Sequence, residues 1–311
     1  FKLLYYKLPI INGYRKYMSN LVTDIKSLEL ETLKNLKSSK ALNTLRAYKA
    51  DYKDFASFCI KNGFKPMPSE PKIISLYLTH LSKSCKFSTL KRRLASISVI
   101  HRISGHYIDI KHPMITENLM GIKRIKGSYQ KAKKPILINE LKLIIDVIDK
   151  DKNEKNRYKN RSLILVGFAG GFRRSELVAI SYEDIDFVTE GVKIFVKRSK
   201  TDQSGEGMTK GIPYFSNPHY CPVVSLKNWL DKSKINFGRV FNISDKSVAL
   251  TIKKYAAIAG LDSKKYSGHS LRSGFATSTA ELGAEERSIM SMTGHKTTQM
   301  VRRYIQEANL F

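Results

Sequence analysis

The sequence of 311 residues contains only 3 cysteines, and Cys59, Cys85 and Cys221 lie far apart without a CxxC pair. This spacing argues against a disulfide framework or a structural zinc site, and it is typical of a reducing compartment. Long apolar runs are also missing. The longest uncharged one, SLILVGFAGGF, is much shorter than the ~20 residues that cross a bilayer. We therefore expect a soluble protein with no membrane partner, in the cytoplasm (on the nucleoid) of a prokaryote or in the nucleus of a eukaryote.

Acidic residues are scarce as well. The chain carries 27 Asp and Glu against 55 Lys and Arg, a formal net charge of +28, and the excess is spread along its whole length. A surface this basic repels itself unless it faces a polyanion, which favours contact with nucleic-acid phosphates. The alternative is a lysine-rich proteome. Charge alone does not say which nucleic acid is bound.

The first half of the chain has the pattern of short amphipathic helices. Apolar residues recur at helical spacing over residues 41–63, 69–85 and 88–105, and basic residues occupy the opposite faces. We interpret residues 1–20 as an N-terminal extension and 21–122 as a helical DNA-binding domain. The candidate DNA contacts of this domain are Thr44, Arg46, Lys91, Arg92 and Arg93.

A basic segment without apolar periodicity follows at residues 123–135, and we interpret it as a linker. Its candidate contacts with the DNA backbone are Lys131, Lys133 and Lys134. Residues 136–311 mix helical patterns with a half-buried strand over 191–200, a glycine-rich loop and a returning strand over 211–215. The predicted fold is mainly α with a small antiparallel sheet (α+β).

Several short motifs of the second half carry residues suited to phosphate chemistry. GGFRRSEL places Arg173 two residues after a double glycine, and SKT places Lys200 at the end of the predicted strand. HSLR and TGH then supply two histidines and an arginine, and RRY supplies a tyrosine. These residues are His269, Arg272, His295 and Tyr304. Singly each is weak evidence, because the chain has 16 tyrosines and 7 histidines.

Together these residue types match phosphodiester transesterification. Paired guanidiniums neutralise the phosphate without ever deprotonating, a tyrosine attacks with a histidine as base, and a lysine protonates the departing hydroxyl. This set of residues needs no metal, and a covalent link to the tyrosine conserves the bond energy, so we expect no metal, no ATP and no other cofactor. The absence of a Walker loop is consistent with a reaction that does not use ATP. Tyr255 and Tyr266 are rivals for the nucleophile. Lys197, Arg198 and Lys210 are rivals for Lys200.

In this order the motifs resemble those of the tyrosine recombinase (phage integrase) family. The resemblance covers residues 40–311 and implies an N-terminal helical core-binding (SAM-like) domain followed by a catalytic domain. It also implies that Glu176 supports Arg173, that a covalent 3′-phosphotyrosine forms, and that double-stranded DNA is bound at specific recombination sites. A protein that is monomeric in solution would act as a homotetramer on two sites, with accessory DNA-bending proteins as further partners. Arg174 departs from the family pattern, which usually has an apolar residue there.

Three functions fit these residues: a site-specific DNA recombinase of the integrase type, a type IB-like DNA topoisomerase, and a non-catalytic DNA-binding relic of a recombinase. The small helical domain at the N-terminal side favours a recombinase over a topoisomerase. The complete set of site residues argues against a relic.

Overall fold

The computed structural model describes residues 25–38, 41–127, 132–199, 202 and 205–308. The chain divides into two compact units, Phe1–Gln130 and Lys131–Phe311, and each has a hydrophobic core of its own. The predicted extension 1–20 and the candidate residues Lys131 and Lys200 lie outside the described residues. Within the described ranges, no helix is both long and apolar enough to cross a membrane.

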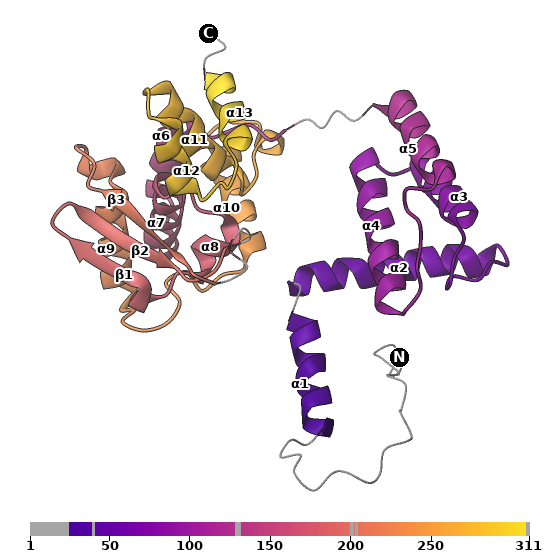
Figure 1. Cartoon of the computed structure of the whole chain (residues 1–311). Helices are drawn as coiled ribbons and strands as arrows, with labels where there is room; N and C mark the ends of the chain where they lie inside the picture. The colour runs from indigo at the N-terminus through magenta and orange to yellow at the C-terminus, as the bar shows by residue number, and fades with distance from the viewer. Residues whose placement is uncertain (1–24, 39–40, 128–131, 200–201, 203–204, 309–311) are drawn as a thin grey trace, which may run out of the picture. The chain divides into compact units, whose positions relative to one another are not determined.

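The first unit is entirely helical in its described part (Figure 1). Its helices are α1 (Ile25–Ser38), α2 (Leu42–Lys61), α3 (Pro71–Ser82), α4 (Phe87–Ile103) and α5 (Pro113–Lys126). The inward faces of α2 to α5 supply a core that includes Phe55, Tyr77, Leu90 and Ile115. Ile122 is buried against this core, and α5 continues to Lys126 before Gly127, at φ 69°, ends it. The predicted linker, which begins at residue 123, therefore starts too early.

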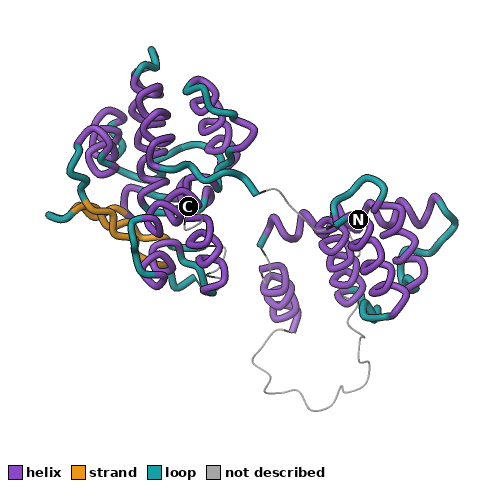
Figure 2. Tube along the Cα trace, turned by 90° about the horizontal axis from the view of Figure 1, so that it is seen from above, coloured by secondary structure: helices purple, strands orange, loops and turns teal. Residues whose placement is uncertain are grey.

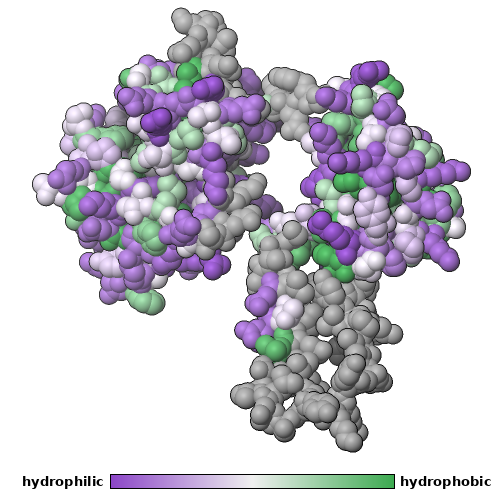
Figure 3. Space-filling view, viewed as in Figure 1, coloured by the Kyte–Doolittle hydropathy of each residue, from purple (hydrophilic) through white to green (hydrophobic). Residues whose placement is uncertain are grey.

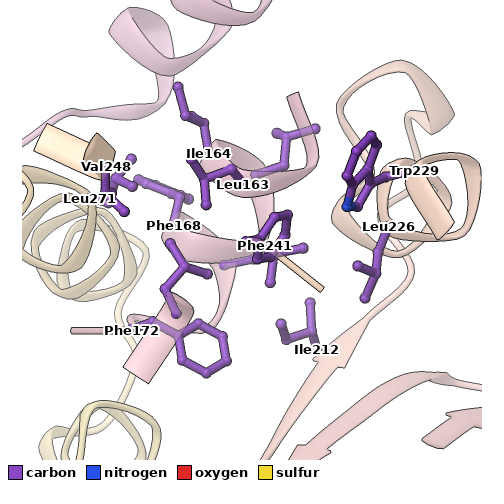
Figure 4. Close-up of a cluster of buried hydrophobic side chains, with 14 of the residues drawn as sticks. Leu163, Ile164, Phe168, Phe172, Ile212, Leu226, Trp229, Phe241, Val248 and Leu271 are labelled. Carbon is purple, nitrogen blue, oxygen red and sulfur yellow. The ribbon is translucent and has the colours of Figure 1, made fainter. Parts of the chain in front are cut away.

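The second unit consists mostly of helices and has a small sheet at one edge (Figure 2). Its helices are α6 (Ile138–Asp149), α7 (Glu154–Ala169), α8 (Arg174–Ala179), α9 (Pro222–Ser233), α10 (Asp245–Ile258), α11 (Ser270–Glu281), α12 (Glu286–Thr293) and α13 (Thr298–Ala308). Helix α7 is buried from Ser162 onward, because its second half is apolar on all sides. Phe168 of this helix lies in a core with Phe241 and Leu271 (Figure 4).

The sheet has three antiparallel strands in the order β1 (Ile185–Val188), β2 (Gly191–Val196) and β3 (Met208–Pro213). The predicted alternation of β2 is present, with Val192, Ile194 and Val196 buried. Both strand boundaries differ from the prediction, because β2 ends at Val196 and β3 begins at Met208. The register then pairs Ile194 with Lys210 and turns this lysine inward.

Two glycines bring the functional segments together. Gly171, at φ 53°, reverses the chain after α7 and leads it into α8. Gly274 lies against the backbone of Ile136, where a Cβ atom would come within 1.9 Å of the carbonyl oxygen. The absence of a side chain at Gly274 therefore allows α11 to pack closely against this backbone. Figure 1 shows α11, α12 and α13 gathered side by side, and a small core of Ala276, Ile289 and Val301 joins them.

Candidate active site

Arg173 stands at the start of α8, directly after the turn that follows α7. Its backbone N–H donates to Glu176 Oε2 at 2.9 Å, and its Nη1 donates to Oε1 of the same carboxylate at 2.6 Å. Its Nη2 donates to the carbonyl of Gly294 at 3.3 Å. Glu176 is buried, so this arginine is held by two bonds to one carboxylate and one bond to the chain beyond α12.

Arg174 points elsewhere. Its Nη2 lies 4.0 Å from Asp245 Oδ2, its side chain is 42% exposed, and its methylene groups lie against Gly268. A capping arrangement at the first turn of α8 explains the difference, because Glu176 reaches back to Arg173, the residue just before the helix, and not to Arg174. The structure therefore turns Arg173, and not Arg174, toward the other candidate residues.

Arg272 lies within α11 and is 1% exposed. Its Nη1 donates to the carbonyl of Gly171 at 2.9 Å, and its Nη2 lies 3.0 Å from His295 Nε2. Burial, and then the positive charge of Arg173, lower the pKa of this guanidinium to about 10. At neutral pH the side chain stays charged, at a position where almost no water stabilises it.

His295 follows Gly294, whose φ of 62° ends α12 as the TGH motif predicts. Its Nδ1 lies 2.8 Å from Thr293 Oγ1, and that hydroxyl donates to the carbonyl of Ile289 at 2.6 Å. Because Arg272 can only donate, His295 Nε2 accepts and the ring is neutral with its proton on Nδ1. Burial and then the charges of Arg272 and Arg173 lower its pKa to about 4, in agreement with a neutral ring.

His269 and Tyr304 meet across the opening of this cluster. His269 is the residue that directly precedes α11, and its Nε2 lies 3.1 Å from Tyr304 Oη. Partial desolvation of the ring by surrounding atoms lowers the pKa of His269 below the usual value of a histidine. The positive charges of Arg272 and Arg173 add to this effect. Tyr304 stands on α13 with its ring centroid 6.0 Å from that of His295.

The two rival tyrosines are occupied elsewhere. Tyr255 is 1% exposed and donates to Asp151 Oδ2 at 2.6 Å, and Tyr266 is 2% exposed and donates to Glu140 Oε1 at 3.0 Å. Burial, and then the hydrogen bond to a carboxylate, raise the pKa of both hydroxyls. Neither faces the two candidate arginines, so the geometry favours Tyr304.

The lysine candidates also differ in their surroundings. Lys200 itself lies outside the described residues. Lys197 pairs with Asp184 Oδ1 at 2.7 Å, and Lys210 is completely buried beneath Arg173 and Arg272. Sequence reasoning treated Lys210 only as a neighbour of Lys200 and did not consider Thr293 at all. The available signal for Lys210 was strand alternation, since Met208, Lys210 and Ile212 share one face of β3.

The predicted DNA contacts of the first unit have different surroundings. Lys91 and Arg46 are exposed, and Thr44 is half-buried. Arg93 was expected to point outward, and this is wrong: its side chain is only 18% exposed, with Nη1 2.6 Å from Asp54 Oδ2. The physical reason is a buried carboxylate, because Asp51 on α2 faces α4 and attracts the arginines there.

Arg92, the neighbour of Arg93, also pairs with Asp51, although 47% of its side chain is exposed. In the second unit, Lys133 Nζ donates to the carbonyl of Lys264 at 2.6 Å, and Lys134 pairs with Glu140. Both lysines remain exposed. The backbone of Lys134 also donates to Lys265, so this basic segment is attached to the chain just before His269.

Positive charge exceeds negative charge in the cluster formed by the candidate active-site residues. Arg173, Arg272 and Lys210 surround a single carboxylate, that of Glu176. Such an excess, held by carbonyls and a neutral histidine, is suited to an anion such as a phosphate. In the described ranges, no group of three His, Cys, Asp or Glu residues is arranged to hold a metal ion.

The model of the phage integrase family matches residues 136–310, the segment that contains all of these residues. The chain belongs to the phage integrase family. It is 42% identical over 299 residues to an integrase/recombinase xerD homolog of Selenomonas ruminantium, covering 91% of this chain and 87% of that protein. It is 27% identical over 270 residues to the tyrosine recombinase XerD of Staphylococcus epidermidis, covering 83% and 86%.

Solved structures agree on the fold. The XerH site-specific recombinase in a post-cleavage complex matches with a TM-score of 0.67 at 17% identity, covering 91% of this chain and 82% of that one. A lambda integrase dimer bound to a core site matches with a TM-score of 0.57 at 20% identity, covering 93% and 98%. The predicted fold class and family are therefore confirmed. The protein is a tyrosine-type site-specific recombinase, and the topoisomerase and relic alternatives are not favoured.

Proposed function

We propose that this recombinase cleaves duplex DNA by direct attack of Tyr304 on the scissile phosphate. The observation that supports this most is the 3.1 Å separation between Tyr304 Oη and His269 Nε2, beside the buried guanidinium of Arg272. A phenol is a weak nucleophile until a nearby base accepts its proton. His269 is in hydrogen-bonding reach and its pKa is lowered, so its ring is neutral and able to accept at neutral pH.

The step is balanced without an external energy source. Tyr304 Oη forms a bond to phosphorus, its proton passes to His269 Nε2, and the bond from phosphorus to the 5′ oxygen breaks. The departing 5′ oxygen takes a proton from Lys200, the acid that the family resemblance implies. The product is a 3′-phosphotyrosine and a free 5′-hydroxyl, and attack by another 5′-hydroxyl reverses the step and rejoins the strand.

The two arginines stabilise the charge that develops on the phosphate. Arg173 and Arg272 are held by Glu176, Gly171 and Gly294 before any ligand arrives, so they need little reorganisation in the transition state. His295 accepts from Arg272 and fixes its orientation. Removing a single preorganised donor of this kind typically costs about 100-fold to 1000-fold in rate.

The substrate is double-stranded DNA at specific sites. The XerH structure is of a recombinase bound to its difH substrate, and the lambda integrase structure is of a dimer bound to a core site, which supports DNA as the ligand here. The net charge of +28 supports the same ligand. Hydrophilic residues cover much of the face of each unit seen in Figure 3, with apolar residues scattered among them.

We also propose how the recombinase assembles on DNA and in which compartment of the cell it acts. Four protomers act on two sites, with DNA-bending proteins as accessory partners. Both the helical unit and the catalytic unit contact the duplex. The named relatives come from bacteria, which favours the cytoplasm over the nucleus.

A nicked duplex from the boundary of the genetic element that carries the gene tests the chemistry. The protein is incubated with strands labelled at either end and separated on a denaturing gel. We expect a covalent adduct that retains the DNA on the 5′ side of the break, joined through its 3′ phosphate, and a released strand with a free 5′-hydroxyl. An adduct of the opposite polarity, or binding without an adduct, contradicts the proposal.

A further inference from the structure

Lys210 occupies a position where a lysine is not expected. It lies on the inward face of β3, opposite Ile194, and its neighbours on that face of the sheet are apolar. Its relative exposure is 0%, and it is among the largest completely buried side chains of the protein. A buried ammonium is costly unless its donors are all used, so the surroundings of Nζ need an explanation.

The donors of Lys210 meet backbone carbonyls from two separate segments. Nζ donates to Gly170 O at 2.7 Å and to Met292 O at 2.6 Å, and it lies 3.4 Å from Gly171 O. It also lies 3.9 Å from Glu176 Oε2, and 4.5 Å from the centre of the Phe172 ring. Figure 4 shows where Phe172 lies at the edge of the core.

Both segments carry residues of the proposed active site. Gly170 and Gly171 form the turn that leads directly into Arg173, and Gly171 O also accepts from Arg272. Met292 lies in the last turn of α12, next to the residues that lead into His295. One side chain therefore joins the end of α7 to the end of α12, and these are the two places that orient the arginines and the histidine.

We propose that Lys210 is a positioning residue, whose ammonium group fixes the separation between the Arg173 turn and the His295 turn without contacting DNA. The inference rests on the proposed function, because its effect is measured as a rate of phosphotyrosine formation. It differs from the acid role given to Lys200, since a completely buried amine that donates to three carbonyls cannot reach a departing 5′ oxygen.

The charged groups around Lys210 agree with this role. Burial lowers its pKa to about 7, Glu176 opposes that shift, and Arg272 and Arg173 reinforce it. His295, the other titratable group nearby, is neutral because its pKa is lowered to about 4. A phosphate bound by the two arginines adds negative charge beside Lys210 and so favours the ammonium form during cleavage.

Single-turnover cleavage of the nicked duplex distinguishes a role of Lys210 in positioning the active-site residues from a role in the stability of the fold. The rate constant, the amplitude, the DNA affinity and the melting temperature are measured for the full chain and for Lys210→Met, Lys210→Arg and Lys193→Met. Lys193 is a matched control, because it is an exposed lysine on the neighbouring strand. Misplacement of reacting groups by ~1 Å can lower a rate about 100-fold.

We expect Lys210→Met to lower the rate constant by about 10-fold to 100-fold while the amplitude and affinity stay near wild type. Lys210→Arg, which keeps the charge and several donors, should recover part of the loss, and Lys193→Met should match wild type. A Lys210→Met rate constant within about threefold of wild type overturns the inference. So does a loss confined to amplitude, which indicates a folding defect only.

The Tyr304→Phe variant, run beside these, distinguishes the two proposals. If an adduct still forms in Tyr304→Phe, the proposed nucleophile is wrong, while the ratio of wild-type and Lys210→Met rate constants still decides the role of the buried lysine. If Tyr304→Phe forms no adduct and Lys210→Met matches wild type, the proposed function stands and the positioning inference falls.

Discussion

The arginines of the two units have similar sequence surroundings but different partners. In the helical unit, Arg92 and Arg93 face the carboxylates of Asp51 and Asp54, so positive and negative charges balance. In the catalytic unit, Arg173 pairs with the carboxylate of Glu176 and with the carbonyl of Gly294, whereas Arg272 contacts the carbonyl of Gly171 and the neutral ring of His295.

The difference indicates what each pair does. Two arginines that face two carboxylates stabilise the fold and have little charge left for a ligand. Two arginines with one carboxylate between them keep an excess of positive charge for an anion that arrives later. Local charge balance therefore separates arginines that hold the structure together from arginines that await a phosphate, although both are partly or fully buried.

Removing an arginine of the catalytic pair should have the largest effect. We expect Arg173→Ala and Arg272→Ala each to lower the single-turnover rate of cleavage by about 100-fold to 1000-fold, since each removes a preorganised charge from the transition state. The affinity for DNA should change far less, because it rests on many phosphate contacts. Quenched-flow measurement of adduct formation gives the rate.

Arg174→Ala is the matched control, because Arg174 is adjacent in sequence but exposed and turned toward Asp245. Its rate should stay within about threefold of wild type. A loss in Arg174→Ala as large as that in Arg173→Ala would contradict the assignment of the two arginines.

The positive excess of the catalytic cluster should also appear in the pH dependence. Packing around the ring and the nearby arginines lower the pKa of His269, so the ring is neutral at pH 7. It gains a proton only when the pH falls below the usual pKa of a histidine. The second-order rate constant of cleavage should therefore be level near neutral pH and fall on the acid side, as His269 loses its ability to accept.

In His269→Ala the rate should be lower at all pH values and this acid limb should disappear. His295 cannot produce the limb, because its pKa lies lower still, at about 4. An acid limb that persists unchanged in His269→Ala would show that another group is the base.

The balanced pair of the helical unit should show the opposite behaviour. Arg93→Met leaves the carboxylates of Asp51 and Asp54 with fewer partners, which we expect to destabilise this unit by about 1–3 kcal/mol. Hydrogen exchange of α2 and α4 in the intact chain measures the change. The rate constant of cleavage by bound protein should not change, and a large loss there would mean that Arg93 takes part in DNA contact after all.

Much of the fold follows from sequence patterns. Apolar residues at helical spacing predicted α2, α3 and α4, and alternating residues predicted β2. Strand boundaries were less predictable. The stretch Met208–Lys210 combines a lysine with small and polar residues, so its alternation was missed, and with it the inward position of Lys210.

Motif order brought together the site residues that the structure places in one cluster, but it could not supply their partners. The outward assignment of Arg93 failed because its carboxylate partners lie on another helix, tens of residues earlier in the chain. Thr293 was overlooked because its role is to hold a ring two residues away, a contact that depends on the turn at Gly294.

The most direct test is to identify the residue to which the DNA becomes covalently attached. The adduct formed on the nicked duplex is digested with nuclease and trypsin, and the modified peptide is sequenced by mass spectrometry. The account predicts a nucleotide phosphate on Tyr304, with no adduct in Tyr304→Phe. A nucleotide on Tyr255, on Tyr266 or on any other residue would contradict it.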